Sequence, residues 1–365
     1  MLDERLLRQE EKAIYVLRAL YHSYGYMPYK MGKFEEYELY LRNKDFLVSD
    51  QVITFNDTNG RLMALKPDVT LSIIKSGEDH PGYKQKVYYD ENVYRVSQNT
   101  HRYKEIMQSG IECIGDIDLY DMYEVITLAA ESLASIRDSF VLEISHLGLI
   151  SQELELACSD KEFKQGALHC IAAKNTHDLC NLCKTFGVET EKRDRLITFI
   201  TACGNRAEVL QALLPLGDSA ALQQLRALCD MLADSPYKNH IRLDFSVVNN
   251  MNYYNGFVFR GFLEGINSSV LAGGRYDKMM ERMHRRAGAI GFAVYLDLLE
   301  QLHTPKDEYD IDVLVLYDDT VSPQSVLNAV RRFTNEGLSV SAQKCIPERP
   351  RCSSVIDLRK EHPTC

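Results

Sequence analysis

The spacing of hydrophobic residues changes from a helical to a strand period within the first third of the chain. Residues 3–25 place leucine, isoleucine, valine and alanine at helical spacing among charged residues, which predicts an amphipathic helix that ends at Gly25. Two short apolar runs, residues 52–55 and 62–65, flank an Asn-Gly pair. This arrangement is typical of a β-hairpin.

The middle of the chain separates a strand-rich part from a helical part. Strands are predicted at residues 86–96, 108–115 and 140–144, and a helix at residues 118–136. From about residue 151 to 237, leucine, alanine, glutamine and glutamate dominate, and turn signals are spaced for short helices. We interpret this stretch as an all-helical insertion.

Strand patterns return after the insertion. We predict strands at residues 241–245 and 256–262, followed by a helix at residues 289–302. Mostly antiparallel strands interrupted by helices indicate an α+β fold, with a sheet flanked by helices. We assign residues 1–305 to this domain.

The last part of the chain, residues 306–365, is predicted to be a small, separate α/β module. A strand at residues 311–316, a helix at 323–336 and a strand at 338–342 follow one another in a βαβ-like order. We expect the remainder to be a polar tail, so the module is truncated.

The composition is that of an acidic globular protein. The chain has 365 residues, of which 45% are hydrophobic, enough for two or three domains. Its net charge of −10 argues against a broad nucleic-acid surface, which needs clustered lysine and arginine. No apolar run reaches the roughly 18–20 residues of a membrane span, and no signal core follows the charged N-terminus. We expect a cytoplasmic location, without nucleic-acid or membrane partners.

Ten cysteines occur in the chain, and the tightest cluster comprises His169, Cys170, His177, Cys180 and Cys183. Cys180 and Cys183 have the Cys-x-x-Cys spacing of zinc sites, but no second pair follows at a finger-like distance. The surrounding helical pattern favours reduced thiols on buried helix faces. We therefore expect neither a metal nor a cofactor.

Candidate binding residues fall in four short blocks. The first, Leu-Lys-Pro-Asp-Val-Thr at residues 65–70, offers Asp68 and Thr70; taken alone, it favours a simple turn after proline. The second contains Arg95, followed by Gln108 and Glu112 on a predicted strand. Alternation puts Gln108 and Glu112 on one face of that strand, and buried polar side chains need partners that a ligand can supply.

The third and fourth blocks are rich in tyrosine and glycine. The third is Asn-Tyr-Tyr and contains Tyr253 and Tyr254; the fourth is Ala-Gly-Gly-Arg-Tyr-Asp at residues 272–277 and contains Tyr276. A lone Gly-Gly pair usually marks a turn. Four blocks that match one known pattern in the same order are improbable as a chance occurrence.

In that order the blocks resemble the histidyl-tRNA synthetases, a family with the class II aminoacyl-tRNA synthetase fold, over roughly residues 5–302. The first is similar to the family's Leu-Arg-Pro-Glu-Gly-Thr, the second to class II motif 2, and the third to Leu-Val-Arg-Gly-Leu-Asp-Tyr-Tyr. The fourth matches the family's Ala-Gly-Gly-Arg-Tyr-Asp. The Lys-Pro-Asp-x-Thr form of the first block is closer to the non-catalytic branch, the regulatory subunits of ATP phosphoribosyltransferase.

The resemblance implies a histidine site. It implies that Asp68 and Thr70 hold the α-ammonium group of histidine, because an ammonium group favours a desolvated carboxylate with neutral acceptors. Arg95 matches the arginine that grips carboxylate and phosphate groups. Gln108 matches a ligand of the amino or carboxyl group.

The other four residues match the family's imidazole pocket. Glu112 corresponds to the carboxylate that accepts a hydrogen bond from the ring, and this selects one tautomer. Tyr254 corresponds to the tyrosine that bonds the far ring nitrogen. Tyr253 and Tyr276 belong to the walls of the pocket.

Two arginines that the family uses for adenylation are absent. Asn249 and Leu298 stand in their places, and Tyr295 replaces a small glycine near the nucleotide. Negative charge builds on the α-phosphate during activation, and losing one preorganised donor commonly costs about 10²–10³ in rate. The arginine missing at position 249 also contacts the carboxylate of the amino acid in the family. We therefore expect no catalytic residues and no enzymatic activity of the chain itself.

The resemblance then implies a regulatory subunit of ATP phosphoribosyltransferase, required for the first step of histidine biosynthesis and for its feedback inhibition. The implied partners are the short-form catalytic subunit in a hetero-oligomer, a second copy in a dimer, and free histidine as effector. The alternatives are a divergent histidyl-tRNA synthetase, or a histidine sensor that acts on another partner.

Overall fold

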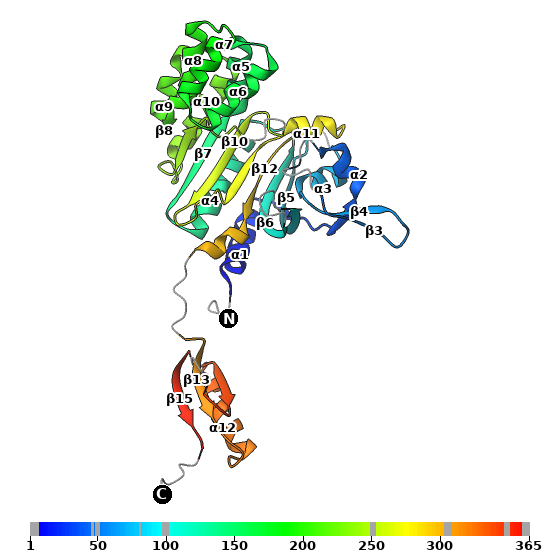
Figure 1. Cartoon of the computed structure of the whole chain (residues 1–365), viewed down its shortest axis with the longest axis vertical. Helices are drawn as coiled ribbons and strands as arrows, with labels where there is room; N and C mark the ends of the chain where they lie inside the picture. Colours follow the sequence, from blue (N-terminus) through cyan, green and yellow to red (C-terminus); the bar gives the residue numbers. More distant parts are fainter. Residues whose placement is uncertain are drawn as a thin grey trace. The chain divides into compact units, whose positions relative to one another are not determined.

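The computed structural model describes most of the chain, namely residues 7–44, 47, 52–79, 82–96, 102–248, 253–302, 309–346 and 351–359. The chain divides into two compact units, residues 1–302 and residues 303–365. A nine-stranded sheet forms the centre of the first unit (Figure 1). In the described residues, no helix is both long and apolar enough to cross a membrane.

The large sheet is mixed but mainly antiparallel. Only β1 with β5 and β7 with β9 pair in parallel among its described strands. The strands are, in spatial order, β1 (Met27–Pro28), β5 (Gln85–Val96), β6 (Tyr103–Gly115), β12 (Gly288–Tyr295), β11 (Leu271–Arg275), β10 (Phe257–Leu263), β7 (Phe140–His146), β9 (Ile241–Asp244) and β8 (Cys203–Gly204). The α+β class predicted from the sequence is confirmed.

One face of this sheet is covered by α1 (Gln9–Ser23) and α4 (Leu119–Ile136). Tyr21 of α1 is fully buried and packs edge-on against Phe292 of β12, with ring centroids 6.0 Å apart. At the start of α4, the Asp118 side chain accepts hydrogen bonds from two backbone N–H groups, which stabilises the first turn. The helix predicted at residues 118–136 is confirmed as α4, and α1 lies within the range predicted for the first helix but begins only at Gln9.

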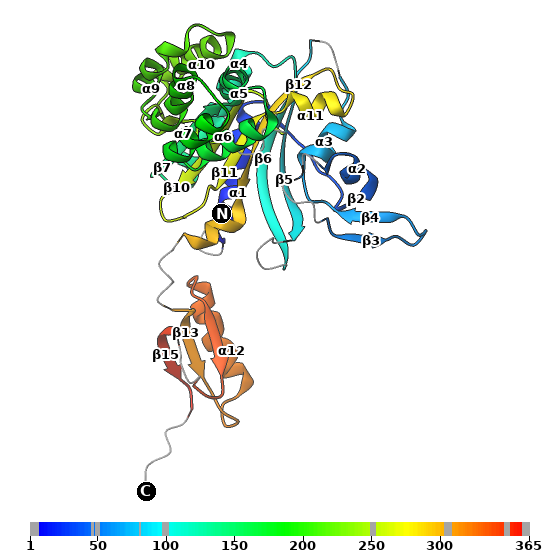
Figure 2. The ribbon, with the colours of Figure 1, turned by 45° about the horizontal axis from the view of Figure 1, so that its top comes forward.

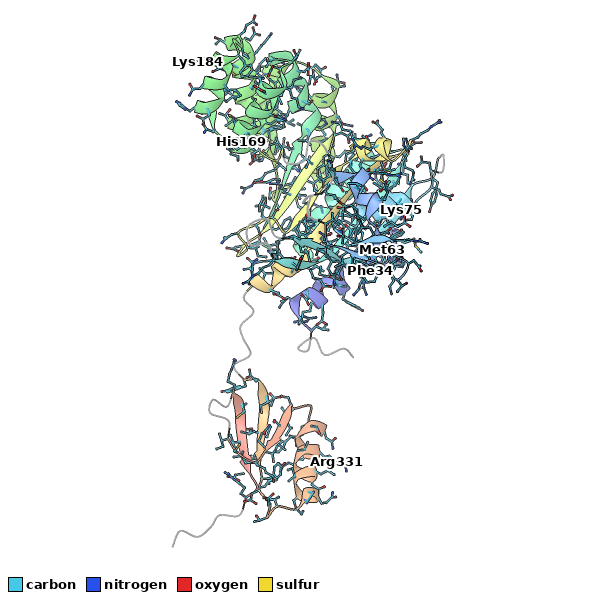
Figure 3. The ribbon with its side chains drawn as sticks, turned by 45° about the vertical axis from the view of Figure 1, so that its right-hand side comes forward. Phe34, Met63, Lys75, His169, Lys184 and Arg331 are labelled. Carbon is cyan, nitrogen blue, oxygen red and sulfur yellow. The ribbon has the colours of Figure 1, made fainter. Side chains whose placement is uncertain are left out.

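The stretch predicted as an all-helical insertion is mainly helical, although it also contains the short strand β8. It lies beside β7 and β10 (Figure 1). His169 and Lys184, labelled in Figure 3, belong to its α6 and α7. Its helices are α5 (Leu147–Ala157), α6 (Lys161–Ala172), α7 (Thr176–Thr185), α8 (Thr190–Thr201), α9 (Arg206–Ala212) and α10 (Ala220–Met231), with the short 3₁₀ helices η3 (Leu214–Leu216) and η4 (Leu232–Asp234).

The cysteine cluster lies in this insertion and belongs to its packing. Cys170 and Cys183 are buried in the hydrophobic core, on α6 and α7. Burial raises the pKa of the Cys183 thiol to about 11, which keeps it protonated at neutral pH. In the part of the chain that the structure describes, no group of three or more His, Cys, Asp or Glu side chains is arranged to hold a metal.

A small sheet lies beside the other face of the large one. It has the order β2 (Phe34–Glu36), β4 (Leu62–Leu65), β3 (Thr54–Asn56), and the predicted hairpin is its β3–β4 pair, which projects in Figure 2. Figure 3 labels Phe34 and Met63 on this sheet and Lys75 on α3 (Thr70–Ser76). An ion pair of 2.7 Å between Lys75 and Glu35 joins α3 to the sheet. Two further short helices, α2 (Tyr37–Arg42) and α11 (Asp277–Arg282), complete this side.

The helix predicted at residues 289–302 is wrong. The structure has strand β12 there, followed by the 3₁₀ helix η5 (Leu296–Gln301). β12 lies between β6 and β11, so both of its faces are largely buried and its sequence is apolar throughout. A continuous apolar run of this length has no period that distinguishes a central strand from a buried helix.

The second unit is a three-stranded parallel sheet with one helix. The predicted strand, helix and strand are confirmed as β13 (Ile311–Leu316), α12 (Pro323–Asn335) and β14 (Val340–Gln343). The prediction of a polar tail is wrong, because β15 (Cys352–Asp357) pairs in parallel with β13. β15 is an edge strand with mostly exposed side chains, so its sequence lacks the apolar run by which strands are recognised.

Candidate functional site

A cavity lies on the face of the large sheet that α3 covers, and its volume is about 100 Å³. One water molecule needs roughly 10–15 Å³ of such volume, so the cavity has room for a small molecule. The eight residues proposed from the sequence all line it: Asp68, Thr70, Arg95, Gln108, Glu112, Tyr253, Tyr254 and Tyr276. These side chains come from β5, β6, the start of α3 and the segments around β10 and β11.

The register of β6 and β12 forms the floor of the cavity. Glu112 lies opposite Gly291 and Gln108 lies opposite Tyr295, so the alternation of the two strands turns all four positions to the same face. Gln108 and Glu112 are 4% and 2% exposed. The prediction that these two residues share one buried face is confirmed.

Two glycines provide space for the side chains of the cavity. A Cβ atom on Gly291 would lie 1.9 Å from Oε2 of Glu112, and one on Gly274 would lie 2.8 Å from Cδ1 of Tyr254. Contacts this short do not occur between non-bonded atoms. Glycine at these positions therefore allows the carboxylate and the tyrosine ring to lie flat against neighbouring strands.

The segment that carries Asp68 is fastened to β5 by three bonds. The backbone N–H of Tyr94 donates to the carbonyl of Lys66 (2.8 Å), and Nε of Arg95 donates to the carbonyl of Pro67 (3.0 Å). Nζ of Lys66, a fully buried side chain, pairs with Glu91 at 2.8 Å. These bonds hold the loop against the sheet and fix where α3 begins.

Asp68 serves both the turn and the cavity. Its Oδ1 accepts a hydrogen bond of 2.9 Å from the backbone N–H of Leu71, which is the turn chemistry that the sequence block favours on its own. Burial raises the pKa of Asp68, while the N–H of Leu71 and the charge of Arg95 oppose that rise. A cationic ligand group in the cavity would favour the ionised form of Asp68.

Glu112 is the most constrained group of the site. Its Oε1 accepts a hydrogen bond of 2.7 Å from Oγ1 of Thr70, and its Oε2 accepts one from the hydroxyl of Tyr276. Burial raises the pKa of Glu112 to about 8; the two hydroxyl groups oppose this rise and the charge of Asp68 adds to it. At neutral pH the carboxyl group is mainly protonated, so it can exchange a proton with a basic ligand group such as imidazole.

Three tyrosine rings make an aromatic wall beside Glu112. The ring centroids of Tyr253 and Tyr254 are 4.6 Å apart, and those of Tyr253 and Tyr276 are 5.8 Å apart. Offset and tilted rings at these distances favour a flat, partly polar guest between apolar faces and hydroxyl groups. The wall and the carboxyl group together suit an imidazole ring.

Among the other residues that line the cavity, Tyr89, Arg260 and Tyr295 have large polar side chains. Tyr295 is recognisable from the sequence as a bulky replacement of a glycine, whereas the sequence motifs do not indicate Tyr89 and Arg260 as ligands. Arg260 stands two residues after Val258 on β10, and this alternation places both on the cavity face. Strand alternation alone could have found Arg260, but it lies outside the four sequence blocks.

Of the two residues that stand where the family has arginine, the structure describes only Leu298. Leu298 lies on η5, is partly buried and packs against the main hydrophobic core; it does not line the cavity. Asn249 lies outside the described residues. Tyr295 contributes a large side chain to the cavity at the position where the family's glycine leaves room.

A large antiparallel sheet with a central polar cavity, a helical insertion and a separate small C-terminal unit defines a class II synthetase-like protein. A crystal structure described as an ATP phosphoribosyltransferase regulatory subunit/histidyl-tRNA synthetase from Bacillus halodurans has this fold, with a TM-score of 0.76 over 99% of this chain and 97% of that one, at 23% identity. A family model described as histidyl-tRNA synthetase matches residues 2–299. The chain therefore belongs to the histidyl-tRNA synthetase family.

Two other similar proteins indicate a branch of this family. The ATP phosphoribosyltransferase regulatory subunit of Oceanobacillus iheyensis is 28% identical over 323 residues, which cover 85% of this chain and 79% of that protein. The structure of an ATP phosphoribosyltransferase complex from Thermotoga maritima has a TM-score of 0.62 at 19% identity, over 79% of this chain and 97% of that one.

Proposed function

We propose that this chain is the non-catalytic regulatory subunit of ATP phosphoribosyltransferase and that its cavity binds free histidine as a feedback signal. Its partner is then a short-form catalytic subunit that joins ATP to phosphoribosyl pyrophosphate, and the complex acts in the cytoplasm, where ATP is supplied. The names of the similar proteins support the role in the complex. The single observation that carries histidine binding is the buried, doubly hydrogen-bonded Glu112 beside three tyrosine rings.

The residues in and near this cavity favour a histidine sensor rather than a synthetase that activates histidine with ATP. Adenylation needs positive groups arranged around the α-phosphate of ATP. The leucine at position 298 packs into the core, and Tyr295 occupies space beside Gln108. The cavity therefore retains the groups for an amino acid and has a bulky side chain near the expected place of the nucleotide.

Feedback requires only a difference in affinity. Histidine must bind more tightly to the inactive arrangement of the complex than to the active one, and the ratio of the two affinities sets the extent of inhibition. Cavity residues supply the affinity for histidine. The conformation of the surface that contacts the catalytic subunit must then depend on whether the cavity is occupied.

The test is reconstitution. The short catalytic subunit from the same organism is assayed for formation of phosphoribosyl-ATP, alone, with this chain, and with this chain plus histidine. We expect activity to depend on this chain and to fall when histidine is added. Activity of the catalytic subunit that is unaffected by this chain would refute the regulatory role.

A second assay separates the regulator from a divergent synthetase. Purified chain is mixed with histidine, ATP, magnesium and labelled pyrophosphate, and exchange of label into ATP is followed. We expect no exchange above background. Clear histidine-dependent exchange would show that the chain activates histidine and would favour the synthetase.

A further inference from the structure

Arg260 lies in the same row of the large sheet as two alanines that line the cavity, Ala272 and Ala293. On β10 it lies opposite Ala272 of β11, which lies opposite Ala293 of β12, which in turn lies opposite Gly110 of β6. Each residue of this row points to the cavity face, because directly opposed residues share a face. Arg260 is the only long side chain among these four positions.

The small residues of this row leave room for the arginine side chain and for a ligand. Neighbouring strands lie about 4.8 Å apart, so β10 and β6 are separated by roughly 14 Å across β11 and β12. The side chains of Ala272 and Ala293, which lie between these two strands, are single methyl groups. Both alanines and Arg260 line the cavity. A guest can therefore lie over the two alanines, with Glu112 at one end and Arg260 at the other.

The guanidinium group of Arg260 has unused hydrogen-bond donors. Within the described residues, it makes no hydrogen bond and no ion pair, although an arginine carries five N–H donors. Glu143 of β7 lies directly opposite Arg260 and is half-buried; burial raises its pKa, whereas the charges of Lys174, Arg242 and Arg260 oppose that rise. The charge of Arg260 therefore acts on Glu143 over a distance, and the two side chains do not form a close ion pair.

A second guanidinium group approaches the same part of the cavity. Burial raises the pKa of Tyr295, and the positive charges of Arg95 and Arg260 both oppose that rise, while the charge of Asp68 adds to it. The phenol of Tyr295 thus lies within the field of two arginines from different strands. Nε of Arg95 is already used by the carbonyl of Pro67. Of these two arginines, Arg260 therefore offers more unoccupied N–H donors to an anionic group of a ligand.

We propose that Arg260 binds the α-carboxylate of the free amino acid in this cavity, with Arg95 beside it and the side chain of the ligand at Glu112. The assignment rests on the proposed histidine site and adds to it the group that distinguishes a free amino acid from an amine of similar shape. A fork of N–H donors suits a carboxylate, because it can donate two parallel hydrogen bonds.

The test compares two ligands and two arginines by calorimetric titration of the full chain. Histidinol has the ring and ammonium group of histidine but a hydroxymethyl group in place of the carboxylate. Arg260→Met should weaken histidine binding by about 10- to 100-fold, the usual effect of a hydrogen bond to a charged group, and leave histidinol binding unchanged. Arg242→Met is the matched control on β9, which is separated from β10 by β7; this arginine is exposed and does not line the cavity. It should bind both ligands like wild type.

Histidinol binding by Arg260→Met also reports that the cavity is folded, and Arg260→Lys, which keeps the charge but not the fork, should fall between wild type and Arg260→Met. Equal losses of histidine and histidinol, or no loss of either, would overturn the carboxylate assignment while leaving the histidine site in place. A wild-type chain that binds no histidine would overturn the proposed site and this assignment together.

Discussion

Replacing Glu112 with glutamine should make the stability of the protein less dependent on pH. Burial raises the pKa of Glu112 to about 8 in the folded chain, from its ordinary value of 4.5. Between these two pH values the folded chain holds a proton that the unfolded chain has released. The wild-type contribution is therefore fully present below about pH 4.5 and is lost as pH rises through about 8.

The magnitude follows from the shift. One pKa unit corresponds to about 1.4 kcal/mol, so the free energy of unfolding of wild type, relative to Glu112→Gln, should fall by roughly 3–5 kcal/mol between pH 5 and pH 9. At pH 5 the variant itself should lose about 1 kcal/mol, because the two hydroxyl groups donate to different oxygens of Glu112 and the amide nitrogen that replaces one of them cannot accept a hydrogen bond. Asp68 titrates in both proteins, so the comparison isolates Glu112.

The assay is urea unfolding at five pH values from 5 to 9, followed by far-UV circular dichroism because the chain has no tryptophan. Glu105→Gln supplies a matched control, since Glu105 is exposed on the same strand. It should follow wild type at every pH. A difference between wild type and Glu112→Gln that stays constant with pH, or that grows toward acid pH, would refute the reasoning.

Two further substitutions test the packing of the site. Gly291→Ala places a methyl group 1.9 Å from the buried carboxylate, and overpacking of this kind should cost about 1–3 kcal/mol in urea unfolding and abolish histidine binding in calorimetry. Gly32→Ala meets no atom closer than 3.5 Å and should change little; equal effects of the two would contradict the packing argument. Lys66→Met leaves Glu91 without its buried partner and should cost about 3 kcal/mol, whereas Lys75→Met, at a half-exposed pair, should cost less than about 1 kcal/mol; a reversed order of the two melting temperatures would show that burial does not govern these pairs.

Most of the sheet could be predicted because its strands carry a local signal. β5 places its buried residues between less buried ones, and β3 and β4 flank an Asn-Gly turn. β12 could not be recognised, because a central strand buried on both faces loses the alternation on which prediction depends. β15 failed for the opposite reason, since its side chains are mostly exposed.

The residues of the cavity could be predicted mainly from the family's sequence motifs. Hydrophobic and polar patterns alone indicated fewer of them. Asp68 and Glu112 are far apart along the chain, and only the family's order of blocks suggested that they meet. Arg260 belongs to none of these blocks, and its place became visible only from the register of β10 with β11 and β12. Pairing between strands distant in sequence is the information that local patterns lack.

The central claim is that this cavity recognises histidine through the carboxyl group of Glu112. The most direct measurement is calorimetric titration of histidine into wild type and into Glu112→Ala, with the fold of both checked by circular dichroism. We expect saturable binding to wild type and loss of most of that affinity in the folded variant. Histidine binding of equal strength in both proteins would contradict it.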